Sequence, residues 1–258
     1  MSTMMRRIIT SPDSVLSTRV ASPSAATYAS RTSTIATKPS RTSSVFYHPL
    51  AEAGVTPLAA GGDDSVTYPI LKVLGKKEPL GLVHIDAHTD TWGPFMGSKF
   101  HHGAPFRLAA DGGYIDPKRT IQIGIRGAQN TKEGWDYSLE SGMRVVFIEE
   151  FEELGVSGVI EEARKIVGDG ATYVSFDVDG LDPVYAPGTG TPEVGGITTR
   201  EAQRLLGGLR GLNLIGGDVV EVSPPFDPSG NTALVGATLM YEILCLLAES
   251  RASNARSG

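Results

Sequence analysis

The stretch from Leu82 to Asp90 constrains this chain more than any other part of the sequence. Apolar residues run as far as Ile85, after which Asp86, His88 and Asp90 occupy alternate positions. Residues two positions apart face the same side of an extended backbone. We therefore expect two carboxylates and one imidazole to converge where a buried strand ends.

The segment Tyr173–Asp179 repeats this arrangement much later in the chain. Asp177 and Asp179 lie two residues apart and follow the apolar pair Tyr173 and Val174. The carboxyl ends of neighbouring parallel strands meet at one edge of a sheet, where ligand sites form. Either cluster alone could be a set of solvated loop carboxylates or helix caps. Two matching clusters together indicate one shared site.

Four carboxylates and one imidazole in a small volume carry too much negative charge to stay ionised without a cation. Like charges repel strongly where the dielectric constant is low. A ligand set that is rich in oxygen and contains some imidazole suits Mn²⁺. A carboxylate-bridged pair of ions fits this number of ligands better than a single ion. The sequence therefore predicts a binuclear manganese site.

Length and composition narrow the class of protein. The 258 residues, 40% of them hydrophobic, can bury one sizeable core. No uninterrupted apolar run approaches the roughly 18 residues of a membrane span. The net charge of −6 argues against a nucleic-acid partner and suits a cationic substrate. The single Cys245 excludes a disulfide within the chain and favours an intracellular setting.

Residues 1–50 differ in composition from the rest of the chain. They hold six basic residues and one acidic residue, and are dense in Ser, Thr and Ala. Such a segment cannot bury enough apolar surface to offset its ordering entropy, which predicts a disordered tail. An Arg-rich, Ser-rich and acid-poor segment is also typical of an organellar transit peptide. A cytoplasmic or a mitochondrial location, an inert tail and a replaced piece of the domain all stay open.

Residues 51–251 are expected to form the folded domain, in which strands alternate with helices. We expect strands at 56–60, 80–85, 120–125, 144–148, 173–178 and 214–222. We expect helices at 66–76 with Ser65 as N-cap, at 103–110, at 151–167, from Thr198 or Thr199 to Leu209, and at 232–248. Apolar strands that alternate with helices are typical of a parallel sheet covered on both faces.

Several motifs keep one order and spacing along the chain. They are Gly61-Gly62-Asp63-Asp64-Ser65, Asp86-Ala87-His88-Thr89-Asp90, His102-Gly103, Ser175-Phe176-Asp177-Val178-Asp179-Gly180-Leu181-Asp182-Pro183 and Glu221-Val222-Ser223-Pro224. In this order they resemble the ureohydrolases, the arginase–agmatinase family, over about Pro57 to Ala248. Segments 100–106 and 187–193 resemble the agmatinase and guanidinobutyrase types more than arginase itself.

The resemblance implies an arginase-type, three-layer α/β fold with a mainly parallel sheet, whose N-terminal part is shortened in this chain. It implies a Mn²⁺ pair and a hydrolase acting on C–N bonds in linear amidines. A small guanidino substrate, of the agmatine or guanidinobutyrate type, would yield urea and an amine after attack by a hydroxide held between the ions. The chain is then expected to form homo-oligomers, or hetero-oligomers with an active paralogue. Other metal hydrolases on the same fold remain an alternative.

The resemblance also implies roles for the ligands. Asp86 and Asp177 would bridge the two ions, and His88 and Asp179 would bind one of them. Asp90 would bind the other ion and shuttle a proton as the intermediate collapses.

Two further residues are expected to act on the substrate. His102 occupies the position of the family's general acid/base histidine, and its pKa near neutrality suits that role. Glu221 is expected to hold the guanidinium through paired hydrogen bonds. His101 and His84 are interpreted as packing residues, and Glu193 as either a surface residue or a neighbour of the substrate.

Asp64 departs from the family pattern, which places a histidine ligand of the first metal at that position. A carboxylate can bind Mn²⁺, but Asp is shorter than His, and its extra charge would raise the pKa of the bridging water. Either Asp64 completes an active hydrolase, or the chain is a catalytically weak or inactive ureohydrolase-like subunit. Family members also place further βα structure ahead of this turn, so strand 56–60 is expected to be an exposed edge.

Overall fold

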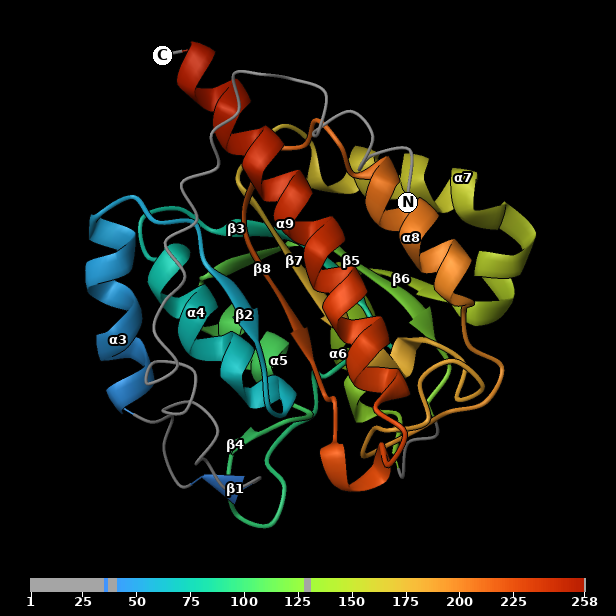
Figure 1. Cartoon of the computed structure of the whole chain (residues 1–258). Coiled ribbons are helices and arrows are strands. Elements are labelled where there is room, and N and C mark those ends of the chain that lie inside the picture. The colour runs from blue at the N-terminus through green and yellow to red at the C-terminus, as the bar shows by residue number, and fades with distance from the viewer. Residues whose placement is uncertain (1–34, 37–40, 128–130, 258) are drawn as a thin grey trace.

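A six-stranded sheet forms the centre of the computed structural model, which describes residues 35–36, 41–127 and 131–257 (Figure 1). The strands lie in the order β2-β8-β7-β3-β5-β6, and all their pairings are parallel. Their bounds are β2 Leu58–Ala60, β3 Leu80–Ile85, β5 Ile115–Ile125, β6 Arg144–Phe147, β7 Thr172–Asp177 and β8 Leu214–Val220. A separate antiparallel pair joins β1 (Ile35–Ala36) to β4 (Phe100–His101).

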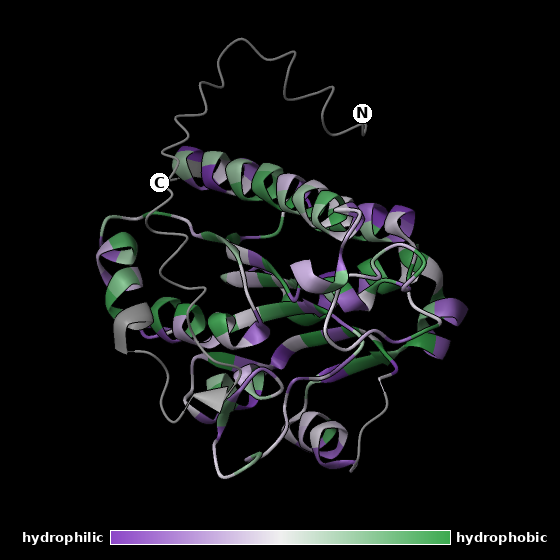
Figure 2. Ribbon diagram, turned by 60° about the horizontal axis from the view of Figure 1, so that its bottom comes forward, coloured by the Kyte–Doolittle hydropathy of each residue, from purple (hydrophilic) through white to green (hydrophobic). Residues whose placement is uncertain are grey.

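Helices cover both faces of the sheet (Figure 2). One face carries α7 (Ile148–Val167), α8 (Thr199–Gly208) and α9 (Asn231–Ser257), whose buried side chains form one core with the sheet. The other face carries α3 (Arg41–Glu52), α4 (Thr67–Leu74), α5 (Pro105–Asp111) and α6 (Glu133–Ser141) around a second core. The predicted three-layer α/β arrangement is confirmed.

The alternation of side chains along β3 explains why the sheet has a core on each side. Val83 and Ile85 belong to the core under α7, α8 and α9, whereas Leu80 and Leu82 belong to the opposite core. The strand is buried along its whole length, as a central strand of a covered parallel sheet must be. Residues with the parity of Leu82 therefore point towards α4 and α5, and this side carries the site.

Most predicted elements are present, and the differences have local causes. The prediction of Ser65 as an N-cap is wrong, because the Asp63 carboxylate accepts the Ser65 backbone N–H and starts the 3-10 turn η1 (Asp64–Val66) instead. Thr198, one of the two expected caps, forms a full capping box with Glu201 at the start of α8. Helix α7 is kinked at Gly155, where φ is +63°.

Two helices were not expected from the sequence. Helix α6 carries a weak apolar pattern, and α3 lies partly within the segment assigned to the tail. The described part of the predicted tail is therefore helical from Arg41 onwards. Residues 1–34 and 37–40 lie outside the described residues, and the predicted tail and domain boundary remain predictions there.

Strand β2 pairs with β8 along one side only within the described part of the chain. It is therefore an edge strand, as expected. Helix α9 reaches the length and mean hydropathy of a membrane span. Leu239, Ile243 and Leu246 of this helix are nevertheless buried against the sheet, so it serves as a core helix here.

The capping box gives a test of the fold. Thr198→Ala should lower the free energy of unfolding by about 1 kcal/mol, because it removes the hydroxyl that accepts the Glu201 N–H. Urea denaturation measures the loss. Thr199→Ala, one residue further into the helix, is the matched control, and equal losses in the two variants would contradict the assignment of the cap.

Candidate metal centre

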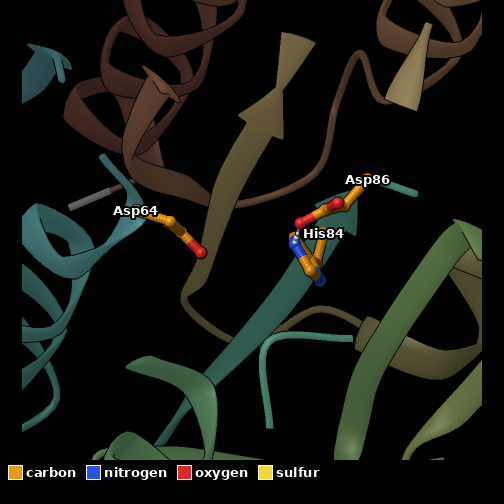
Figure 3. Close-up of side chains that lie close together, drawn as sticks. All are labelled: Asp64, His84 and Asp86. Atoms are coloured by element: carbon orange, nitrogen blue, oxygen red, sulfur yellow. Dashed lines mark hydrogen bonds and ion pairs between the residues drawn. The ribbon is translucent and has the colours of Figure 1, made fainter. Parts of the chain in front are cut away.

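Of the six predicted metal ligands, the structure places Asp64, Asp86, His88 and Asp179 in two groups beyond the carboxyl ends of the strands, whereas Asp90 and Asp177 fall in neither group. Ligand atoms of Asp64, His84 and Asp86 all lie within 4.8 Å of one another, and so do those of Asp86, His88 and Asp179. Figure 3 shows Asp64 directed across the site towards His84 and Asp86. Asp86 belongs to both groups.

The backbone presents these side chains because β3 and β7 end in matching turns. The Asp86 carboxylate accepts the His88 N–H at 2.6 Å, and the Asp177 carboxylate accepts the Asp179 N–H at 2.8 Å. In each cluster, the first aspartate thus stabilises the turn that follows its strand. Asp179 reaches across to the other cluster, where its Oδ1 accepts the Ala87 N–H at 3.2 Å.

His88 lies between two carboxylates. Its Nδ1 is 3.1 Å from Asp179 Oδ2 and 3.4 Å from Asp86 Oδ1. Its Nε2 is 3.6 Å from Glu193 Oε1, which places the Glu193 carboxylate beside His88. Burial opposes protonation of His88, but the two aspartates outweigh it and raise its pKa to about 11.

Asp64 and Asp90 are buried carboxylates that face each other and their acidic neighbours. Asp64 Oδ1 accepts the Thr67 hydroxyl at 2.8 Å. Among the described residues its buried Oδ2 accepts from no N–H or hydroxyl group, and the Asp64 carboxyl group lies in hydrogen-bonding contact with that of Asp90. Asp90 adopts a left-handed backbone conformation, with φ at +49°. Burial, with the charges of Asp86 and other carboxylates, raises the pKa of both side chains well above the usual range.

The same physics applies to Asp177 and Asp179. Burial, reinforced by Asp86, raises the pKa of Asp177 well above its ordinary value and that of Asp179 to about 6. These charges stay ionised together only if a cation compensates them. The donor set of carboxylate oxygens and one imidazole nitrogen fits divalent manganese. The buried Asp64 Oδ2, which accepts from no N–H or hydroxyl group of the described residues, fits it as well.

Glu221 and His102 lie beside this cluster. Glu221 has a left-handed backbone, with φ at +65°, and its Oε1 accepts the Asp64 N–H at 2.8 Å. His102 Nδ1 is 3.7 Å from the same oxygen, and its side chain is 38% exposed, which leaves it open to a substrate. Burial lowers the pKa of His102 and raises that of Glu221 to about 8.

His101 and His84, the two histidines interpreted as packing residues, have different roles in the structure. His101 is buried and its Nε2 is 2.9 Å from the Gly93 carbonyl, in agreement with a packing role. The interpretation of His84 as a packing residue is wrong, because its Nε2 lies 2.7 Å from Asp86 Oδ2. His84 is two residues before Asp86, so the same alternation that connects Asp86 and His88 could have found it.

Sequence reasoning also missed Arg126, which follows β5. Its guanidinium donates to the backbone carbonyls of Asp179 at 2.8 Å and Glu193 at 2.7 Å. Asp182 accepts the N–H groups of Gly195 and Gly196 from within the same loop. Arg126 thereby fastens both ends of the 179–194 loop next to the site, and such multiple contacts are invisible in a single sequence.

Residues 21–246 match the sequence model of the arginase family. The chain belongs to the arginase family. A guanidinopropionase of Pseudomonas aeruginosa is 57% identical over 211 residues, which are 81% of this chain and 66% of that protein. A mitochondrial agmatinase of Gallus gallus is 49% identical over 202 residues, which are 78% of this chain and 59% of that protein.

Solved structures agree with this family assignment. The proclavaminate amidino hydrolase of Streptomyces clavuligerus superimposes with a TM-score of 0.78 and 41% identity, over 81% of this chain and 70% of that one. The arginase-type fold expected from the motifs is confirmed. This arginase-family chain spans less than two thirds of the length of the two curated relatives.

The raised carboxyl pKa values predict how the metal-free protein responds to pH. Burial raises the pKa of Glu221 from an ordinary value of 4.5 to about 8 in the folded state. Between these two pH values, the folded chain holds a proton that the unfolded chain has lost. Stability therefore falls as the pH rises through this window. The elevated pKa of His88 acts in the same direction above 6.5.

With a chelator present, the thermal unfolding midpoint should be lower at pH 8 than at about pH 5.5. Saturating Mn²⁺ should remove or reverse the difference, because the ions bind the ionised carboxylates. A metal-free midpoint that rises over this interval would contradict the electrostatic account.

Gly127 gives a geometric test of the His88 position. A Cβ at Gly127 would lie 2.2 Å from His88 Cδ2 and 2.5 Å from its Nε2, so Gly127→Ala must displace the His88 ring or the backbone beside it. We expect at least a tenfold loss of Mn²⁺ affinity, in the range typical of disturbed metal-site neighbours. Gly62→Ala is the control, because a Cβ there meets nothing within 4 Å. Isothermal titration with Mn²⁺ measures both, and unchanged affinity in Gly127→Ala would place His88 outside the site.

Proposed function

We propose that the chain is a binuclear manganese hydrolase that cleaves the guanidino group of a small substrate to urea and an amine. The observation that carries this proposal is the position of Asp86, whose ligand atoms lie within 4.8 Å of those of His88 and Asp179 in one group and of Asp64 in the other. The names of the relatives, among them a guanidinopropionase and an agmatinase, support the guanidino substrate class.

Six side chains would hold the two ions. Asp86 and Asp177 would bridge them, His88 and Asp179 would bind on one side, and Asp64 and Asp90 on the other. The buried Asp64 Oδ2, which accepts from no N–H or hydroxyl group of the described residues, supports a direct role for Asp64 in place of the usual histidine. When bound, the ions would supply a water molecule of lowered pKa at neutral pH.

The remaining residues would act on the substrate. A guanidinium is a poor electrophile, because its charge is delocalised, so it must be held and oriented for attack. Glu221 presents a carboxylate that can accept two N–H groups of the guanidinium. His102, half-exposed beside Glu221 and with a pKa held low by burial, can exchange a proton with the amine that leaves. Asp90 would move a proton within the buried cluster.

The acidity of the site favours a positively charged guanidino group. Glu193 lies against His88 at the mouth of the cluster and adds to this charge. The end of the substrate that lies away from the guanidinium decides between agmatine, guanidinobutyrate and guanidinopropionate. We propose this group of compounds as the substrates to compare.

A second candidate function is a ureohydrolase-like subunit with weak or no catalysis. Asp64 in place of the family's histidine favours it, and so does the one-sided pairing of β2, which leaves an edge for another subunit to cover. In either case we propose an oligomer, of identical chains or with an active paralogue. The location is cytoplasmic or mitochondrial; the agmatinase of Gallus gallus is named mitochondrial.

Elemental analysis of protein reconstituted with Mn²⁺ tests the two candidates, with urea release measured on the same sample. Two ions per chain and urea from agmatine, guanidinobutyrate or guanidinopropionate are expected for the hydrolase. One ion or none, without urea from any of the three, would contradict it and favour the inactive subunit.

If an ion or urea release is missing, Asp64→His tests whether Asp64 is the cause. In an inactive subunit, this change should restore the second ion and urea release, because it supplies the missing imidazole. In an active hydrolase it should change the rate without changing the stoichiometry. Asp169→His, at an exposed turn, is the matched control and should alter neither quantity.

A further inference from the structure

A row of four buried polar side chains crosses the sheet directly beneath the candidate metal centre. His84 of β3 lies opposite Gln122 of β5 on one side and Ser175 of β7 on the other, and Ser175 lies opposite Asp218 of β8. All four are completely buried. None of them was among the predicted site residues, and polar groups in such a position must be matched to hydrogen-bond partners.

The Gln122 amide can take only one orientation. Its Nε2 donates to the Thr89 carbonyl oxygen at 2.5 Å, and the same nitrogen lies 3.2 Å from His84 Nδ1. A carbonyl oxygen accepts only, so the amide oxygen of Gln122 cannot occupy this place. That oxygen has no hydrogen-bond partner among the described residues, so the Thr89 carbonyl is the contact that sets the orientation of the amide.

This orientation fixes the proton on His84. Because Gln122 donates to Nδ1, a neutral His84 carries its proton on Nε2. Nε2–H then donates to Asp86 Oδ2 at 2.7 Å, while Asp86 Oδ1 accepts the His88 N–H at 2.6 Å. Phe106 packs against the imidazole ring, with centroids 4.2 Å apart, and keeps it in place. Asp86 Oδ2 is therefore oriented by the His84 imidazole, and Asp86 Oδ1 by the backbone N–H of His88.

We infer that Gln122 and His84 are positioning residues, which orient the Asp86 carboxylate for the metal pair from beneath the site. The inference rests on the proposed function, because it assigns a metal-binding role to Asp86. Outer partners of this kind typically contribute about 10- to 100-fold to metal affinity or activity.

The grouping of Asp64, His84 and Asp86 suggests a different role, in which His84 itself replaces the missing histidine ligand. A ligating nitrogen must offer a free lone pair, but Nε2 carries the proton once Gln122 has occupied Nδ1. The same contacts therefore assign His84 as a donor to Asp86.

Two His84 variants separate these roles. His84→Gln can place an amide N–H near the position of Nε2 and keep the donor to Asp86, whereas the shorter Asn reaches only the position of Nδ1. We expect Mn²⁺ affinity within a few-fold of the parent for His84→Gln and a loss of about 10- to 100-fold for His84→Asn. Isothermal titration with Mn²⁺ alone measures both. Equal losses in the two variants would overturn the inference.

Thr120→Val is the matched control. It removes a buried hydroxyl of β5 that donates to the Asp116 carbonyl at 2.9 Å, two residues before Gln122, in a hydrogen bond that involves neither His84, Thr89 nor Asp86. Mn²⁺ affinity should be unchanged, and a loss equal to that of His84→Asn would show that any buried hydrogen bond near the site has this effect.

Nitrogen NMR of the His84 ring tests the inference without metal or substrate. The parent should show a protonated Nε2 and an unprotonated Nδ1. Gln122→Met removes the donor to Nδ1, so Nδ1-protonated His84 should appear beside the Nε2 tautomer, and Mn²⁺ binding should weaken because the donor to Asp86 is then lost in part of the molecules. A protonated Nδ1 in the parent would overturn the positioning role, whatever the protein does with guanidino compounds. A correct tautomer in a chain that releases no urea would leave the inference standing and contradict the proposed hydrolase.

Discussion

The burial of several carboxylates at one edge of the sheet is the constraint on which the rest of this structure depends. Asp64, Asp86, Asp177 and Asp179 are almost completely enclosed, and each raises the cost of ionising its neighbours. Burying several ionised carboxylates together destabilises the fold unless a bound cation offsets their repulsion. The arrangement is therefore best explained by cation binding. Divalent manganese matches the donors, and the arginase-family match agrees with that chemistry.

Polar side chains of the sheet form hydrogen bonds that orient the carboxylates of the site. Side chains on one face of β3, β7, β8 and β5 form a buried polar layer, and hydrogen bonds rise from it to the site. Thr67 lies between Asp218 and Asp64, at 2.7 and 2.8 Å, while His84 connects Gln122 to Asp86. The apolar cores on both faces keep these contacts out of water, which strengthens each of them. Function here therefore depends on strand register as much as on the ligands themselves.

The sequence predicted those parts of the fold and site that local spacing determines. The apolar run predicted the bounds of β3, and alternation placed Asp86 beside His88. The two matching clusters implied that strands far apart in sequence end together. Contacts that depend on register across strands, such as Gln122 with His84, leave no trace in one sequence. Helix α6 was missed because its nine residues carry few apolar positions, and Arg126 because its partners are backbone carbonyls of a distant loop.

A crystal structure of the Mn²⁺-loaded protein, with anomalous data collected at the manganese edge, tests the central claim most directly. The account predicts two anomalous peaks bridged by Asp86 and Asp177, with Asp64 bound to one ion and His84 bound to neither. A single peak, or a manganese ion coordinated by His84 Nε2, would contradict it.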